Sequence, residues 1–326
     1  MIISRTPLRI SFVGGGSDIA GFYRKSPGAV VTTAINKYIY IMVEKQFDGR
    51  IIVQYSQMEI VKHVSDIQNN LVREAMKMTG IKGGIHVTSI SDVPAEGTGM
   101  GSSSAYVVGL LNAFYAYQGK AVSTRELARQ ACAIEIEILK KPIGKQDQYI
   151  AAFGGFQYMQ FHPDHTVSAD PIGCNAQTKK KLESHLLLFY TGLTRSADAI
   201  LARQGKNVET QAETQNTLGS MVGFARSMRE DLNNNDLTTF GALLHANWNL
   251  KKTLADTITT PQIDGWYALA KKQGAAGGKV LGAGGGGFLL LYVEPQYHLQ
   301  IKKALHDLLP LDFRFEPKGS RIVYEG

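Results

Sequence analysis

The part of the sequence best suited to chemistry is a glycine- and serine-rich stretch at residues 94–105. It follows a predicted strand at 85–91 and leads into a predicted helix at 104–118. Glycines let backbone N–H groups approach an anion, and the N-terminus of a helix adds its positive dipole. The serines can donate hydroxyls to phosphate or coordinate magnesium. The stretch therefore predicts a phosphate-binding loop, but not a Walker A motif, because serine rather than lysine follows Gly101.

Two other interpretations of this loop stay open at the level of sequence. A flexible turn that ends in a serine helix cap would have the same composition. The run Gly101-Ser-Ser-Ser-Ala105 also nearly fits the nucleophile elbow of serine hydrolases, with Ser103 as the nucleophile. That chemistry needs an acid and a histidine. No motif identifies them, and the candidates are Asp147 or Asp198 with His245.

A second glycine run, at 282–287, formally matches the G-x-G-x-x-G fingerprint of dinucleotide-binding folds. That fingerprint requires a helix after the glycines, whereas residues 288–293 form an apolar, strand-like run. The sequence therefore argues against a Rossmann site. It predicts either a tight turn between two strands or a loop that closes over the active site.

An acidic residue lies on the apolar side of a predicted helix. Ser123 and Glu126 have the spacing of a capping box, so a helix should begin at Ser123 and run to about residue 139. Glu135 should project from its apolar face, and a buried carboxylate needs a metal ion or a polar partner. Glu137 should point to solvent and pair with Lys141 four residues later. The neighbours of Glu135 at helical spacing are Ala131, Cys132, Ile138 and Leu139.

A second acidic residue, Asp147, lies in a loop at 142–149 that contains proline and glycine. An acid in such a loop is commonly a turn-former. If it lies beside the phosphate-binding loop, it could instead accept or orient the proton of an attacking hydroxyl.

The elements that must position these residues suggest two domains, as expected for 326 residues. Short β-branched or aromatic runs in the first half predict a mostly antiparallel sheet, followed by helices. A polar stretch at 162–181 places the division near residue 170, giving domains 1–170 and 171–326. The expected strands are 9–13, 29–33, 38–43, 51–55, 185–190 and 288–293, and the expected helices are 67–78, several within 197–273, and 297–308.

Composition narrows the class of protein. A hydrophobic content of 44% and a charged content of 19% are typical of a globular protein. No apolar run approaches the ~20 residues that span a bilayer, and no secretory signal is recognised, so a cytoplasmic protein without membrane partners is expected. The two cysteines suit neither a disulfide framework nor a zinc site. The net charge of +7 favours anionic ligands, but the basic residues are scattered, so no nucleic-acid partner is expected.

Three stretches in order resemble the motifs of the GHMP kinases: residues 7–18, 94–105 and 279–288. This resemblance implies an α+β fold with an N-terminal domain like domain 2 of ribosomal protein S5 and a C-terminal ferredoxin-like domain. It also implies that ATP and a small-molecule substrate bind between the two domains, with Mg²⁺ as a cofactor.

The resemblance assigns roles to individual residues. Asp147 would be the catalytic carboxylate and Arg9 its neighbour, while Ser103 and Glu135 would hold Mg²⁺. The triphosphate would lie against Gly97, Gly99, Met100, Gly101, Ser102, Ser103 and Ser104. On the substrate side the expected residues are Asp18, Gly16, Ser17, Gly285 and Arg195. Lys37 and Lys145 are further candidates for a substrate phosphate.

Within the superfamily, the first motif departs from galactokinase, because Gly15 and Gly16 replace an acid and a histidine. In residues 9–18, 144–149, 153–156 and 191–197 the chain is more similar to the bacterial kinases of D-glycero-D-manno-heptose 7-phosphate. Those enzymes phosphorylate the anomeric hydroxyl to give a 1,7-bisphosphate used for nucleotide-activated heptose. L-fucose kinases resemble the same motifs and remain an alternative. Rivals from other classes are a serine hydrolase, an ATP-dependent decarboxylase of the same fold and a basic nucleic-acid-binding module.

Overall fold

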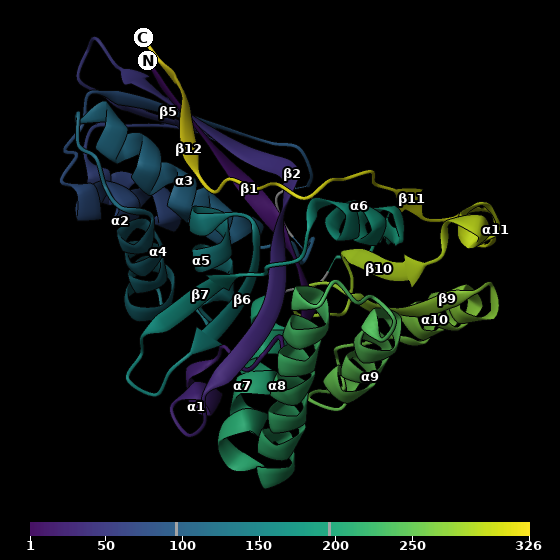
Figure 1. Cartoon of the computed structure of the whole chain (residues 1–326). Coiled ribbons are helices and arrows are strands. Elements are labelled where there is room, and N and C mark those ends of the chain that lie inside the picture. Colours follow the sequence, from purple (N-terminus) through teal and green to yellow (C-terminus); the bar gives the residue numbers. More distant parts are fainter. Residues whose placement is uncertain (95–96, 195–196) are drawn as a thin grey trace.

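The computed structural model describes residues 1–94, 97–194 and 197–326, which form two β-sheets with helices packed against them (Figure 1). The larger sheet has the strand order β12-β1-β2-β5-β3-β4, and β6 and β7 extend it from β2. The smaller sheet has the order β11-β8-β10-β9. Together they confirm the α+β class expected from the sequence.

The larger sheet consists of β1 (Ile2–Val13), β2 (Gly28–Lys45), β3 (Ile51–Gln54), β4 (Met58–Val61), β5 (Ile85–Ser91), β6 (Phe156–Phe161), β7 (Val167–Pro171) and β12 (Arg321–Glu325). The smaller sheet consists of β8 (Leu186–Tyr190), β9 (Ala275–Val280), β10 (Phe288–Val293) and β11 (Leu309–Pro310).

The α-helices are α1 (Ala20–Tyr23), α2 (Asn70–Thr79), α3 (Ser102–Tyr117), α4 (Thr124–Cys132), α5 (Gln146–Phe153), α6 (Ala176–Ser184), α7 (Ala197–Thr210), α8 (Ala212–Asn233), α9 (Phe240–Lys252), α10 (Pro261–Lys272) and α11 (His298–Ala304). A π-helix, η2 (Ala133–Ile138), continues α4, and short 3₁₀ helices lie at η1 (Val64–Asp66) and η3 (Pro295–Tyr297).

The prediction of a mostly antiparallel sheet is confirmed, with β3 and β5 as a parallel pair within it. The prediction of separate strands at 29–33 and 38–43 is wrong, because both belong to the single strand β2. Its register on β1 shifts where Pro7 lies opposite Tyr38 and Leu8 opposite Ile35. Two residues of β2 are left without partners on β1 at this bulge, so the strand bends rather than ends.

The C-terminus returns to the first sheet. Strand β12 pairs antiparallel with β1, and the two chain ends lie together at the top of Figure 1. The larger sheet therefore contains residues from both sides of the predicted division near residue 170. The division itself stays a prediction.

Helix α9 packs closely on β9, because two glycines face each other. A Cβ atom on Gly277 would lie 1.9 Å from the carbonyl oxygen of Gly241. On the other side of α9, the amide of Asn247 accepts a hydrogen bond from Gly14 N–H at 3.0 Å. These contacts fix α9 between the smaller sheet and the end of β1.

The start of α4 is stabilised by Ser123, whose side chain accepts a hydrogen bond from Glu126 N–H at 3.2 Å. The reciprocal half of the capping box is not formed, since the Glu126 carboxylate pairs with Arg129. We expect Ser123→Ala to lower the free energy of unfolding by about 1 kcal/mol, because one N–H loses its acceptor. Urea denaturation measures this loss. The neighbouring, exposed Thr124→Ala is the control, and an equal effect of both variants would contradict the capping role.

Candidate active site

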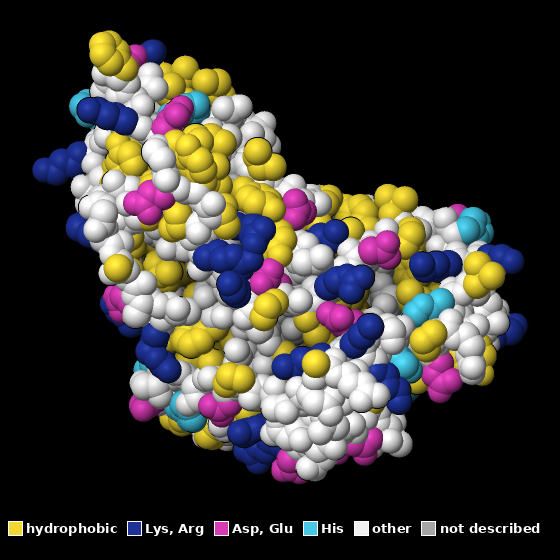
Figure 2. All heavy atoms as spheres, turned by 45° about the horizontal axis from the view of Figure 1, so that its top comes forward, with side chains coloured by type: hydrophobic (Ala, Val, Ile, Leu, Met, Phe, Trp, Pro, Cys, Tyr) yellow, Lys and Arg dark blue, Asp and Glu magenta, His cyan; other side chains and the backbone are white. Residues whose placement is uncertain are grey.

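A cavity of about 710 Å³ is lined by residues from both halves of the chain. On the face drawn in Figure 2, basic and acidic side chains are mixed over most of the surface, and one group of basic side chains gathers near the middle. The cavity volume falls within the range that small-molecule and cofactor sites occupy. The phosphate-binding loop, Asp147, Asp18 and Glu135 all line it.

The phosphate-binding loop adopts the conformation that its glycines allow. Gly97, Gly99 and Gly101 have φ angles of 69°, 72° and 75°, and α3 begins directly after Gly101. The left-handed region is rarely open to residues with a side chain. Gly97, Gly99 and 101–104 line the cavity, whereas the Met100 side chain is fully buried in the core. The predicted loop and helix are thus present, but Met100 does not line the cavity, and its carbonyl oxygen accepts a hydrogen bond from Arg9 N–H at 3.1 Å.

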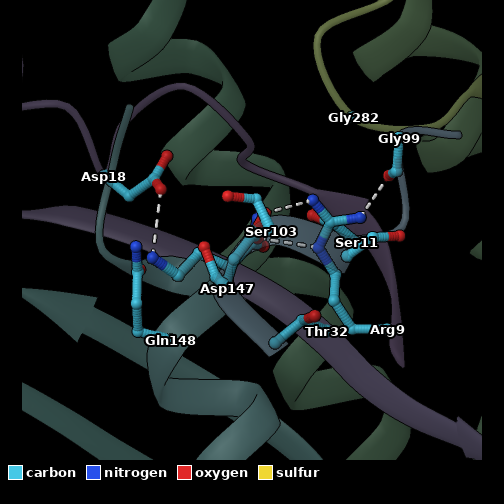
Figure 3. A network of polar contacts seen from close by, with 12 residues as sticks. Arg9, Ser11, Asp18, Thr32, Gly99, Ser103, Asp147, Gln148 and Gly282 are labelled. Carbon is cyan, nitrogen blue, oxygen red and sulfur yellow. Dashed lines mark hydrogen bonds and ion pairs between the residues drawn. The ribbon is translucent and has the colours of Figure 1, made fainter. Parts of the chain in front are cut away.

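Asp147 and Arg9 form a bidentate ion pair at the centre of the site (Figure 3). Arg9 Nε and Nη2 donate to the two carboxylate oxygens at 2.8 and 2.7 Å. Asp147 lies in the first turn of α5 and Arg9 on β1, so two rigid elements hold the pair. Arg9 Nη1 also donates to the carbonyl oxygen of Gly99 in the loop. One guanidinium therefore connects the acid to the phosphate-binding loop.

Asp18 lies beside this pair and is held by backbone groups. Its carboxylate accepts hydrogen bonds from Gly16 N–H at 3.1 Å and Gln146 N–H at 3.2 Å. Burial raises the pKa of Asp18, and the nearby charge of Asp147 raises it further, against the lowering effect of the two N–H groups. Asp18 and Gly16 both line the cavity, as expected for substrate-binding residues.

Glu135 is fully buried, as its position on the apolar helix face predicts. Its oxygens accept hydrogen bonds from Ser103 and Ser104 at 2.6 Å each, and from Gln148 Nε2 at 2.7 Å. Lys141 Nζ lies 3.2 Å from Oε1 of Glu135. The carboxylate thus connects η2 to the start of α3.

The expected pairing of Glu137 with Lys141 is wrong, because Lys141 contacts Glu135 instead. The π-helix explains the difference. Leu139 N–H donates to the carbonyl oxygen of Ile134, five residues earlier, so a spacing of four no longer places side chains on one face. The chain then leaves the helix at Lys140, whose φ is 54°.

Several predicted substrate residues lie away from the cavity. The Ser17 hydroxyl donates to Gly14 O at 2.8 Å and accepts from Ala29 N–H at 3.0 Å, so it holds the chain turn rather than a ligand. Gly285 N–H donates to Ile258 O and is not part of the lining. Lys37 and Lys145 do not line the cavity either. Arg195 lies outside the described residues.

The cavity lining also contains polar residues that were not predicted from the sequence, among them Gln204, Lys251 and Lys279. All three are buried, and the Gln204 amide has no hydrogen-bond partner among the described residues. Burial lowers the pKa of Lys251 to about 8, and the Arg9 charge acts in the same direction. Lys279 begins the third glycine stretch, but no local pattern distinguishes Gln204 or Lys251 from surface residues.

Comparison with known proteins identifies the family. Residues 63–155 match the N-terminal domain of GHMP kinases, and residues 228–310 match their C-terminal domain. Over 98% of this chain and 97% of the relative, the sequence is 31% identical to a D-glycero-alpha-D-manno-heptose 7-phosphate kinase of Campylobacter jejuni. The chain belongs to the GHMP kinases.

Other GHMP kinases agree in fold. The crystal structure of a D-glycero-D-manno-heptose 1-phosphate kinase from Bacteroides thetaiotaomicron has a TM-score of 0.81 and 26% identity, covering 100% of both chains. An L-fucokinase/L-fucose-1-P guanylyltransferase of Bacteroides fragilis is 26% identical over 95% of this chain but only 36% of its own length. The expected GHMP kinase fold is thus confirmed.

The serine hydrolase alternative does not fit this GHMP kinase. Its proposed base, His245, is bonded through Nδ1 to the Tyr267 hydroxyl at 2.6 Å and does not line the cavity. Ser103 donates to Glu135 rather than to a histidine. No histidine among the described residues lines the cavity, so the serine has no base.

The family implies Mg²⁺, and the donors around Ser103 and Glu135 fit this ion. Mg²⁺ prefers oxygen ligands and is commonly bound through one or two carboxylates together with substrate phosphates. The described residues hold no cluster of three or more His, Cys, Asp or Glu suited to a metal, so phosphate oxygens would have to complete the site. Lys141 Nζ lies 2.7 Å from Ser103 Oγ and 3.2 Å from Glu135 Oε1. A metal ion would compete with this amine.

Proposed function

We propose that this protein is an ATP-dependent kinase that phosphorylates the anomeric hydroxyl of D-glycero-D-manno-heptose 7-phosphate, giving the 1,7-bisphosphate. The observation that carries the proposal is the position of Arg9, which binds Asp147 with two N–H groups and the phosphate-binding loop with a third. A carboxylate fixed beside a phosphate loop is what direct phosphoryl transfer to a hydroxyl requires.

In the proposed reaction the acceptor oxygen attacks the γ-phosphorus of ATP. A new O–P bond forms, the bond from the γ-phosphorus to the β,γ-bridging oxygen breaks, and its electron pair stays on ADP. Asp147 orients the hydroxyl and receives its proton, which then passes to solvent. Arg9 holds the Asp147 carboxylate in place with two N–H groups and balances charge on the transferred group. Mg²⁺, held by Ser103, Glu135 and the phosphates, would neutralise the charge of the triphosphate.

The remaining length of the cavity supports a nucleotide. Beyond the loop, its lining continues to Tyr55, Asn69, Ser89 and Tyr106, where aromatic and polar side chains mix. Such a lining suits a base and its ribose. The α- and β-phosphates would then lie against Gly97, Gly99 and the start of α3, because the N-terminus of a helix presents N–H groups and a positive dipole to anions.

The acceptor is proposed from two observations. The Campylobacter jejuni relative, which matches almost the whole chain, is named for heptose 7-phosphate. Asp18 and Gly16 line the same cavity as Asp147, where a sugar hydroxyl could meet the Asp18 carboxylate. No helix in the described residues has the length and apolar character needed to cross a bilayer. We place the enzyme in the cytoplasm, where ATP is available.

The test is ADP release with Mg²⁺, ATP and one acceptor at a time: D-glycero-D-manno-heptose 7-phosphate, the free heptose, L-fucose, D-galactose or mevalonate. We expect turnover with the heptose 7-phosphate to exceed that with every other acceptor by at least about tenfold in kcat/KM, the difference that one well-made charge contact supplies. Selective use of L-fucose would favour the fucokinase alternative, which the Bacteroides fragilis relative makes the next candidate. Release of CO₂ from an acid acceptor would indicate a decarboxylase.

A further inference from the structure

Lys251 is a buried cation that forms no ion pair with any acid in the part of the chain that the structure describes. It is 4% exposed, and its Nζ donates one hydrogen bond, to the carbonyl oxygen of Gly282 at 2.5 Å. Among residues 1–94, 97–194 and 197–326, no carboxylate lies within ion-pair distance of it. Burying a charge is costly unless an opposite charge or several hydrogen bonds compensate it. Its surroundings therefore leave Lys251 able to bind an anion in the cavity that it lines.

The position of Lys251 identifies which anion it would meet. A Cβ atom on Gly15 would lie 3.9 Å from Lys251 Nζ, so the first glycine motif passes beside the amine. On the other side, Gly282 packs directly on Gly99, since a Cβ on Gly282 would lie 2.4 Å from Gly99 Cα. Gly99 is also the residue whose carbonyl oxygen accepts from Arg9 (Figure 3). Lys251 and Arg9 thus approach the phosphate-binding loop at the same place from the two halves of the chain.

The other buried lysine of the cavity behaves differently. Lys279 Nζ donates to the carbonyl oxygens of Ser11 and Phe12 at 2.9 and 3.1 Å. It connects β9 to β1, and its donors are directed at the backbone. Lys251 has a single carbonyl partner and two further N–H groups, and α9 is fixed by its glycine contact with β9. Helix α9 therefore holds the Lys251 amine in a fixed position at the cavity.

We propose that Lys251 is a catalytic residue that binds the phosphoryl group during its transfer from ATP to the acceptor. Its N–H groups would donate to a peripheral oxygen of that group, opposite Arg9, and no proton leaves the lysine. The inference rests on the proposed kinase function and adds a residue to it. Charge on the transferred group would then be met by one cation from each half of the chain.

The first test compares Lys251→Met with Lys252→Met, its neighbour on α9, which is partly exposed and pairs with Asp264. We expect Lys251→Met to lower kcat by about a hundredfold or more, the effect of removing one donor to a transition-state charge. The Kd for ADP should change by less than about threefold, and Lys252→Met should match wild type. A kcat for Lys251→Met within about threefold of wild type would overturn the proposal.

Stability and pH separate this role from a structural one. Because burial lowers the pKa of Lys251 to about 8, its charged form disfavours the folded state at neutral pH, so Lys251→Met should not lower the melting temperature. The charges facing it are Arg9, Lys279, Asp18 and Asp147. Wild-type kcat/KM, which reports groups of the free enzyme, should fall as pH rises through about 8. Lys251→Arg should retain more activity than Lys251→Met, and its activity should no longer fall near pH 8. A fall near pH 8 that is unchanged in both variants would contradict the assignment.

The phosphate that the acceptor already carries is the other anion that Lys251 could bind. If Lys251 bound that group, Lys251→Met would raise KM for heptose 7-phosphate and leave KM for the free heptose unaffected, which would overturn the proposal.

Fluorine NMR of the enzyme with ADP, Mg²⁺ and aluminium fluoride reports on the position of the transferred group without turnover. We expect the bound fluoride signal to be lost or shifted in Lys251→Met, and an unchanged signal would refute the contact. Absent turnover in wild type would instead refute the kinase function.

Discussion

Replacing Asp147 with asparagine should lower kcat by about 10²–10⁴-fold, the contribution of a positioned general base. Asparagine has nearly the same shape, so one contact with Arg9 can persist, but its amide cannot accept the proton of the acceptor hydroxyl. The Kd for ATP should stay within about threefold of wild type, because the loop glycines and α3 are unchanged. Steady-state kinetics and calorimetric titration of the nucleotide measure the two quantities.

The control for this prediction is Asp164→Asn, an exposed acid in the turn between β6 and β7. It should have wild-type activity. If Asp147→Asn retained turnover, Asp147 could be neither the base nor the group that orients the hydroxyl. If ATP binding were lost together with turnover, the role of Asp147 would be to hold Arg9 and the loop.

Glu135→Gln should weaken Mg²⁺-dependent binding of ATP by at least about tenfold. The substitution keeps the size of the side chain but removes the charge that Ser103, Ser104, Gln148 and Lys141 surround. Binding measured in EDTA should change much less, since the loop still contacts the phosphates. Calorimetry with and without Mg²⁺ gives both values.

Glu137→Gln is the matched control, two residues away on the same π-helix, and the Glu137 side chain is exposed. It should bind MgATP as wild type does. Equal weakening by the two variants would contradict a specific role of Glu135. If ATP binding to the Glu135→Gln variant depended on Mg²⁺ as strongly as in wild type, Glu135 would be only a structural partner of Ser103 and Ser104.

Local patterns were enough to predict the glycine- and serine-rich loop, the helix after it and the buried acid beside it. The glycines at 97, 99 and 101 require left-handed backbone, and the helix after them follows from periodicity. The burial of Glu135 follows from its apolar neighbours at helical spacing. These features depend on residues close in the chain, which is why sequence alone places them.

The positions of other residues could not be predicted in the same way. Lys251 reaches the cavity only because Gly241 lets α9 lie against Gly277, two residues far apart in sequence. Ser17 stands within a motif but turns its hydroxyl to the backbone of Gly14. Long-range packing decided the position of Lys251, whereas the Ser17 hydroxyl is turned by nearby backbone groups of Gly14 and Ala29.

Phosphorus NMR of a reaction containing ATP, Mg²⁺ and D-glycero-D-manno-heptose 7-phosphate tests the proposed phosphoryl transfer most directly. We predict that the γ-phosphate signal of ATP disappears while ADP and a new sugar phosphate signal, coupled to the anomeric proton, appear in equal amounts, with the 7-phosphate signal retained. Release of ADP with inorganic phosphate alone, or a spectrum unchanged from the mixture without enzyme, would contradict transfer to the anomeric hydroxyl.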